Sequence, residues 1–461
     1  MRIALWRILC LPILVLLAAP LCNSQSASTP PWAGKIDAIA EKALTQPVAG
    51  ISIAVAKNGM IVFRRGYGFA NVEHSVPVKP ETVFHIASIS KNIEAGVALQ
   101  LVDLGKMHLE DDLTRYVPLA PVQGKHVTVQ QLLSQTSGIY SFTSLPNAAQ
   151  KEPLDLTHEQ VLDLIRDKPF DFEPGSSWRY DNSGFYLGGM VIEKAVGSDY
   201  ASYAKDHVFQ PLGMTSSQLC DSHMLVPHLA SGYERADGHL IPAELMSWKL
   251  PFAAGAVCAT ATDLLKWEMA LDAGRVLTPA SLNFMRTPTR LSDGTSIDYG
   301  LGTRLGFFHG RRVFGHTGTG GGFSTVLESF PDDRLTIAVL INTADGHAIS
   351  IAANVARAIL GIPAPELSDL PVPEDELKAI PGTYDSDEGP VELFVKDGKI
   401  HFRIPGALPD GGAIPRQGKL TYAIDRDHEV KFLVRNGRAE WGFEYAAGLL
   451  LDAKVRQTEK H

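Results

Sequence analysis

Ser88 and Lys91 lie three residues apart and are the pair in this sequence best suited to covalent chemistry. From Asn92 to Leu104, apolar residues recur at three- and four-residue spacing until Gly105, which predicts an amphipathic helix with Ser88 in its first turn. Residues three apart share one face of a helix, so the lysine amine can reach the serine hydroxyl. A serine needs such a neighbouring base to act as a nucleophile. Ser88 is therefore the candidate nucleophile.

The Ser-x-x-Lys pattern is too short to identify a nucleophile by itself. Ser202 and Lys205 repeat it inside a second short helical pattern, and we interpret that pair as a surface coincidence. The prediction for Ser88 therefore depends on partners supplied by other parts of the chain.

Two distant segments carry groups that an acylating serine requires. Tyr180 and Asn182 lie on a turn-rich loop, where a phenol can exchange protons and an amide can hold a substrate carbonyl. His316, Gly318 and Thr319 lie on a predicted strand, whose edge can lend a backbone N–H to an oxyanion. Taken alone, the first segment fits an ordinary turn and the second a flexible hairpin with an incidental histidine. A phosphate-binding loop is disfavoured, because no Gly-Lys-Ser/Thr follows the glycines after the strand.

Length and composition are typical of a globular protein with more than one domain. The chain has 461 residues, which exceeds the usual size of one hydrophobic core. Its net charge is −9 and it has no long basic run, which argues against nucleic-acid binding. We expect a small-molecule or peptide substrate. The histidines are scattered without metal-ligand spacing, so we predict neither a metal nor an organic cofactor.

Residues 1–24 have the pattern of a secretory signal peptide. An apolar run ending at Leu21 follows two arginines and is too short to span a bilayer comfortably, and small residues favour cleavage after Ser24. Lipidation of Cys22 is a disfavoured alternative, because bulky Leu21 precedes it. The sequence therefore predicts an exported protein, periplasmic or secreted, without a stable membrane span after signal removal.

Periodicity in residues 33–360 predicts an α+β domain. Gly50 to Ala56 and Met60 to Arg65 are strand-like runs joined by an Asn-Gly turn, which is typical of a hairpin. A mostly helical insert is expected between residues 106 and 200. Strand-like runs after Thr287 could return to the sheet begun at residue 50. Those runs are 312–316, 323–330 and 335–341, and a helix over 349–360 closes the domain.

The C-terminal quarter has a different character. Residues 361–376 contain four prolines among acidic residues, which indicates a semi-rigid linker. Residues 377–458 alternate apolar and polar side chains between Asp-Gly and Asn-Gly turns, which predicts a small antiparallel β-barrel. It could cover sheet edges or shape the substrate pocket. Cys220 and Cys258, the cysteines left after signal removal, could pair or remain thiols.

Ser-x-x-Lys, Tyr-x-Asn and His-x-Gly occur in that order, on a helix start, a loop and a strand. This arrangement resembles the serine β-lactamase and penicillin-binding-protein superfamily over roughly residues 33 to 360. The branch it is most similar to contains class C β-lactamases, D-aminopeptidases, carboxypeptidases and esterases. Supporting segments are Arg65–Gly68, Val127–Leu133, Thr136–Gly138, Pro211–Met214 and Gly315–Gly318.

The resemblance implies an antiparallel sheet flanked by helices beside a mostly helical subdomain, and a C-terminal domain similar to lipocalins. It also implies that Ser88 is acylated and that Lys91 and Tyr180 share the general-base work. The backbone N–H groups of Ser88 and Thr319 would form an oxyanion hole. The substrate-binding residues that it implies are Asn182, His316, Gly318 and Thr319.

Two positions depart from the family pattern. Asp181 replaces the serine usual between Tyr180 and Asn182, which places a carboxylate near the site. His316 stands where many β-lactamases and carboxypeptidases have lysine, and a histidine with a reference pKa of about 6.5 is largely neutral at pH 7. A substrate carboxylate would therefore be held less firmly. We favour a hydrolase that acts on an ester or on a small or D-amino-acid peptide; the alternatives are a β-lactam hydrolase and a non-turnover penicillin-binding sensor.

Overall fold

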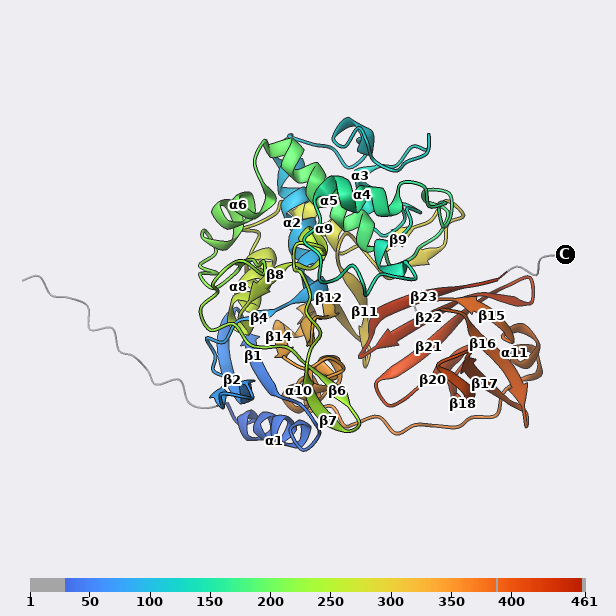
Figure 1. Ribbon diagram of the computed structural model, residues 1–461. Coiled ribbons are helices and arrows are strands. Elements are labelled where there is room, and N and C mark those ends of the chain that lie inside the picture. The colour runs from blue at the N-terminus through green and yellow to red at the C-terminus, as the bar shows by residue number, and fades with distance from the viewer. Residues whose placement is uncertain (1–29, 387–388, 458–461) are drawn as a thin grey trace, which may run out of the picture.

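The computed structural model describes residues 30–386 and 389–457, so the predicted signal peptide lies outside the described residues. An antiparallel sheet flanked by helices dominates the structure (Figure 1), which confirms the predicted α+β class. None of the helices in the described ranges has the length and apolar character needed to cross a bilayer.

The central strands of the sheet are buried on both faces. Strand β1 (Gly50–Lys57) pairs with β2 (Met60–Asn71) through the predicted Asn58–Gly59 turn and with β14 (Leu335–Ile341) on its other side. Both turn residues have positive φ, 54° and 75°, as a tight hairpin turn requires. Because successive side chains of a strand point to opposite faces, each central strand contributes to two hydrophobic layers.

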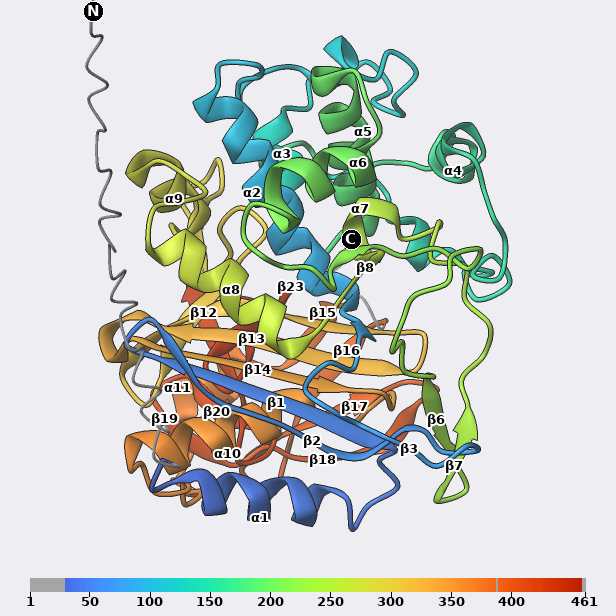
Figure 2. The ribbon, with the colours of Figure 1, turned by 90° about the vertical axis from the view of Figure 1, so that its left-hand side faces the viewer.

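Helices cover both faces of this sheet (Figure 2). Helices α1 (Ala33–Ala43) and α10 (Ala348–Leu360) pack on one face, and α2 (Ser90–Asp103), α5 (Asn182–Val196) and α8 (Ala261–Asp272) lie on the other. Shorter helices lie around them or in the C-terminal part, and the segment 106–200 contains helices and no strand, but most of its residues lie in turns and loops, so the expected mostly helical insert holds only for its regular elements. The shorter helices are α3 (Val129–Leu133), α4 (His158–Ile165), α6 (Tyr200–Ala204), α7 (Phe252–Gly255), α9 (Pro279–Met285) and α11 (Glu374–Ala379).

The strands after Thr287 return to the first hairpin, as the sequence predicted. Their order in the sheet is β11 (Arg304–Phe308), β12 (Arg311–Gly320), β13 (Phe323–Phe330), β14, β1 and β2. Segments separated by about two hundred and eighty residues therefore lie side by side, as in the pairing of Lys57 with Leu335, and the edge of β12 faces the turn before α2.

The C-terminal strands form an antiparallel layer beside the first part of the chain (Figure 1); this layer, here called the C-terminal sheet, is continuous with the first sheet through β23 and β11. Its strand order is β19, β20, β21, β22, β23, β15, β16, β17 and β18. The predicted alternation is confirmed, but β18 and β19 do not pair in the described residues, so the predicted closed, lipocalin-like barrel is not confirmed. The bounds are β15 (Gly382–Asp385), β16 (Val391–Lys396), β17 (Lys399–Ile404), β18 (Leu408–Ala413), β19 (Arg416–Gly418), β20 (Thr421–Ala423), β21 (His428–Arg435), β22 (Arg438–Ala446) and β23 (Leu449–Arg456).

Strand β23 connects the two sheets. It pairs with β22 along one side, whereas its other side meets β11 at Leu449 and β15 at Val455 and Arg456. The C-terminal sheet is therefore joined to the edge of the first sheet through backbone contacts.

Candidate active site

Ser88 lies in a turn of 3-10 helix, η1 (Ala87–Ile89), immediately before α2, and not in the first α-helical turn that the sequence predicted. Ala87 has a positive φ of 46°, a conformation that residues other than glycine rarely adopt. Beside it, β4 (Phe84–His85) pairs with β8 (Val257–Ala259), and the Ile86 N–H donates to Val257 O at 3.0 Å. These contacts fix the turn and leave the Ser88 side chain partly exposed.

A disulfide supports the strand that leads into this turn. Cys258 is bonded to Cys220, with a Cα–Cα distance of 5.8 Å, and faces His85 in the ladder between β4 and β8. The disulfide that the sequence left open therefore braces the strand three residues before Ser88.

Lys91 is buried and held by three acceptors. Its Nζ lies 3.1 Å from Ser88 Oγ, 2.7 Å from Asn182 Oδ1 and 2.9 Å from the Ala254 carbonyl oxygen. The Asn182 side chain also donates to Thr143 Oγ1 at 3.0 Å. The structure thus brings the predicted serine, lysine and asparagine together, and the amine points at the hydroxyl.

Tyr180 lies next to this cluster. Its ring centroid is 4.9 Å from Lys91 Nζ and 6.3 Å from the His316 ring centroid. On β11, Arg304 places its Cζ 5.2 Å from the same Tyr180 ring centroid. The phenol is therefore flanked by two cationic side chains, one of which, Arg304, the sequence analysis missed.

The free edge of β12 lies against the Ser88 turn. The ladder between β11 and β12 ends at Gly315, so the residues that follow it are open on that side. A methyl group on Gly318 would lie 2.2 Å from Ile86 O and 3.1 Å from the Ser88 nitrogen. Thr319 is the next residue and is exposed. Glycine thus permits the close approach of two backbones that an oxyanion hole made of N–H groups requires.

His316 is buried and neutral. Its Nδ1 lies 2.6 Å from Thr317 O, and a carbonyl only accepts, so Nδ1 carries the proton and Nε2 accepts from the Tyr299 hydroxyl at 3.2 Å. Burial lowers the pKa of His316 well below its ordinary value, and the nearby cations Arg304 and Lys91 lower it further. The histidine that replaces the family lysine therefore brings no positive charge.

Asp181 caps a helix. Its carboxylate accepts from the backbone N–H groups of Ser183 at 2.7 Å and Gly184 at 2.9 Å, at the start of α5. Burial raises the pKa of Asp181 to about 7. The carboxylate that the sequence placed near the site is thus directed at the helix terminus that carries Asn182.

The second Ser-x-x-Lys pair has no such surroundings. Ser202 and Lys205 are both exposed on α6 and the turn after it, as expected for a coincidence. In residues 30–386 and 389–457, no group of three or more histidine, cysteine or acidic side chains is arranged to hold a metal ion.

Residues 36–361 match the family model described as Beta-lactamase. This chain belongs to the Beta-lactamase family. As a member of that family it is a serine hydrolase, and the resemblance based on three short motifs is confirmed.

Other members of the Beta-lactamase family are moderately similar. Penicillin-binding protein 4* of Bacillus subtilis is 28% identical over 306 residues, covering 63% of this chain and 67% of that protein. A D-aminopeptidase of Brucella anthropi is 28% identical over 321 residues, covering 69% of this chain and 60% of that protein. The solved octameric penicillin-binding protein homologue from Pyrococcus abyssi is 26% identical with a TM-score of 0.64, over 92% of this chain and 99% of that one. The last likeness extends beyond the family match into the C-terminal sheet.

Proposed function

We propose that this protein cleaves an amide or ester bond of a small substrate through an acyl-enzyme on Ser88. The observation that carries the proposal is the contact of 3.1 Å between Lys91 Nζ and Ser88 Oγ, with the amine buried and fixed by two further acceptors. In its neutral form Lys91 would donate to Asn182 and Ala254 and take the serine proton on its lone pair as the nucleophile attacks; as the ammonium it would leave that proton to Tyr180.

The reaction follows from the surrounding groups. Ser88 Oγ would attack the substrate carbonyl carbon, and its proton would pass to Lys91 or Tyr180. The N–H groups of Ser88 and Thr319 would donate to the oxyanion. As the bond to the amine or alcohol breaks, the same base would return the proton to the leaving group. Water, deprotonated by that base, would then release the acid and regenerate Ser88.

The neutral His316 supports a preference for substrates that are not anchored by a free carboxylate. Its Nε2 is occupied by the Tyr299 hydroxyl, so it offers no charge to a substrate. We therefore favour esters and the amides of small or D-amino-acid peptides, a class that agrees with the name of the D-aminopeptidase relative. A β-lactam hydrolase is the second candidate, because the family match and a penicillin-binding relative both favour β-lactam reactivity.

Export is part of the proposal. It is supported by the apolar N-terminal pattern and by the Cys220–Cys258 disulfide, since disulfides persist in oxidising compartments. Intact mass of the protein recovered from periplasm or medium tests it, and a mature chain that begins at Gln25 is expected. Retention of residues 1–24 in all of the protein would contradict export through a cleaved signal.

The function is tested with p-nitrophenyl esters, D-amino-acid p-nitroanilides and nitrocefin. Ser88→Ala is expected to lose turnover by at least about 10³-fold, because the nucleophile is removed. Ser202→Ala is the matched control, since it removes the serine of the other Ser-x-x-Lys pair, and should keep full activity. A fluorophosphonate should add its mass to the wild type and not to Ser88→Ala. Labelling without turnover would indicate a sensor, and labelling of Ser88→Ala would refute the assignment.

A further inference from the structure

Arg304 is a buried cation without an acidic partner. It lies at the start of β11 with 7% of its surface exposed, and none of the carboxylates in the described residues forms an ion pair with it. Its Nη1 donates to the carbonyl oxygens of Leu450 and Leu451 on β23, whereas its Nε is buried without a hydrogen-bond partner. Burying a guanidinium in this way is costly. Such a position calls for a functional explanation.

The side chains next to Arg304 provide this functional explanation. Its Cζ lies 5.2 Å from the Tyr180 ring centroid, and Lys91 Nζ lies 4.9 Å from the same point. His316, at 6.3 Å between ring centroids, is neutral. The second positive charge beside the phenol therefore comes from Arg304 on the neighbouring strand, and not from the residue that occupies the family lysine position.

We propose that Arg304 is a positioning residue that stabilises the phenolate of Tyr180 during proton transfer, and that the C-terminal sheet takes part in the reaction by holding Arg304. The inference rests on the proposed acylation of Ser88. It gives the C-terminal sheet a role in the chemistry, which family membership of residues 36–361 does not supply.

The contact of the C-terminal sheet with the Tyr180 loop supports this role. Strand β23 meets β11 at Leu449 and β15 at Val455, so the carbonyls of Leu450 and Leu451 lie between these two contacts and face Arg304. Behind the loop, Trp178 packs in one hydrophobic cluster with Trp441 and Leu450 of the C-terminal sheet, and Tyr180 packs against that cluster.

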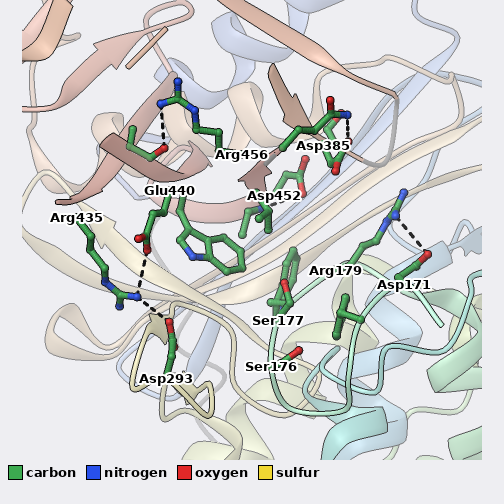
Figure 3. A pocket seen from close by; sticks show the side chains of 18 of the residues that line it. Asp171, Ser176, Ser177, Arg179, Asp293, Asp385, Arg435, Glu440, Asp452 and Arg456 are labelled. Carbon is green, nitrogen blue, oxygen red and sulfur yellow. Dashed lines mark hydrogen bonds and ion pairs between the residues drawn. The ribbon is translucent and has the colours of Figure 1, made fainter. Parts of the chain in front are cut away.

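Loop and sheet also share a cavity of about 610 Å³ (Figure 3). Arg179 and Asp171 line it from the loop, and Glu440 and Arg456 line it from the C-terminal sheet. Its charged groups form pairs within its walls, such as Arg179 with Asp171 at 3.5 Å. The walls of this cavity therefore come from both the loop and the C-terminal sheet, and the direct packing between them is the cluster of Trp178, Trp441 and Leu450.

Of the other ionisable groups around Tyr180, Tyr299, Glu94 and His316 are neutral at pH 7, whereas Asp181, whose pKa burial raises to about 7, is partly ionised. Burial raises the pKa of Tyr299, before β11, and that of Glu94, on α2, so both are protonated. The carboxylate of Asp181 accepts from the N–H groups at the start of α5. Lys91 on α2, Arg304 on β11 and His316 on β12 thus lie beside the Tyr180 ring, Tyr299 interacts with it electrostatically, and Glu94 lies near Lys91.

The test is the pH profile of kcat/KM on a p-nitrophenyl ester. In Arg304→Met the pH of half-maximal rate should rise by about 1 to 2 units, because the guanidinium Cζ lies 5.2 Å from the Tyr180 ring centroid, and a unit charge at about that distance inside a protein has an effect of that size. At pH 7 the rate should fall about 10- to 100-fold. Arg304→Lys keeps the charge and should stay within about half a unit of the wild type, even if it melts at a lower temperature. Arg304→Gln serves as a second neutral variant if Arg304→Met does not fold.

Arg357 provides a matched control. It is also 7% exposed, its Cζ lies 5.2 Å from the Phe308 ring centroid, and it joins α10 to Asp427 of the C-terminal part. Arg357→Met should lower the melting temperature and leave the pH profile unchanged, since Arg357 packs on Phe308 and not on Tyr180.

Two results would overturn the inference. One is a neutral Arg304 variant with the wild-type pH profile in an enzyme still labelled at Ser88. The other is that Arg304→Met lowers kcat/KM as much in a Tyr180→Phe background as in the wild type. If the charge acts through the phenol, Arg304→Met should change kcat/KM less than about twofold in that background. An active Ser88→Ala variant would instead refute the acyl-enzyme proposal, so the two failures are distinguishable.

Discussion

Gly318→Ala tests whether the edge of β12 serves the Ser88 turn. A methyl group there would lie 2.2 Å from Ile86 O and 2.5 Å from Thr325 Oγ1. An ordinary carbon–oxygen contact is about 3.3 Å, so strand and turn must separate by about 1 Å. Thr325 Oγ1 also donates to Ile86 O at 2.9 Å, which limits how the side chain can move aside.

A separation of that size is large compared with the tolerance of an oxyanion hole. Donors act at about 2.7–3.1 Å, and loss of one donor costs about 10²- to 10³-fold in rate. We therefore expect kcat/KM of Gly318→Ala to fall about 100-fold, with a stability loss of about 1–3 kcal/mol from the overpacked site. Turnover of p-nitrophenyl esters gives the first quantity and urea unfolding the second.

Gly315→Ala separates the two effects. Gly315 lies on the same strand, β12, as Gly318. Its methyl group would lie 2.0 Å from Leu327 O of β13, and would therefore point at the neighbouring strand and not at Ser88. It should be destabilised at least as much as Gly318→Ala while losing much less activity. If folded Gly318→Ala kept a rate within about threefold of the wild type, or if both variants lost activity in proportion to stability, the assignment of this strand to the oxyanion hole would be refuted.

Two further predictions concern stability. Glu328 is buried with neither carboxylate oxygen hydrogen-bonded, and burial raises its pKa to about 8 from an ordinary 4.5. The contribution of Glu328 to the free energy of unfolding is complete below pH 4.5 and is lost as the pH rises through 8. The free energy of unfolding of Glu328→Gln, measured with urea, should therefore increase by about 3 kcal/mol relative to that of the wild type between pH 4 and pH 7. An equal difference between the two proteins at both pH values would count against this. Replacing Cys220 and Cys258 by alanine opens a loop of 38 residues and should cost about 4 kcal/mol, and an unchanged urea midpoint would show that the disulfide contributes nothing.

Local patterns predicted the elements that carry the site. The apolar spacing after Lys91 identified α2, and the Asn58–Gly59 turn identified the first hairpin, because both are determined by residues close in sequence. The position of Ser88 was less accurate: no side chain caps α2, and a 3-10 turn precedes it, so the sequence held no sign of the true start.

Only the order of the three motifs allowed us to predict that the site residues lie close together. Lys91 and Asn182 are 91 residues apart, and spacing alone could not show that they meet. Asp181 was interpreted as a charge near the substrate, although an aspartate before a helical apolar pattern is also a capping signal. Arg304 left no signal, because its partners are backbone carbonyls of a strand about 146 residues away, and any sequence can supply a carbonyl.

Strand β23 also has a consequence for how this architecture can change over evolution. It occupies the outer edge of β11 at Leu449, next to Phe307, which is 61% exposed. An unpaired strand edge recruits strands from other molecules unless charge, proline or a bulge blocks it. A descendant that lost the last hundred or so residues would therefore tend to aggregate until substitutions on β11 prevented the exposed strand edge from pairing with other molecules. Loss of the C-terminal residues and substitutions on the edge of β11 would have to occur together.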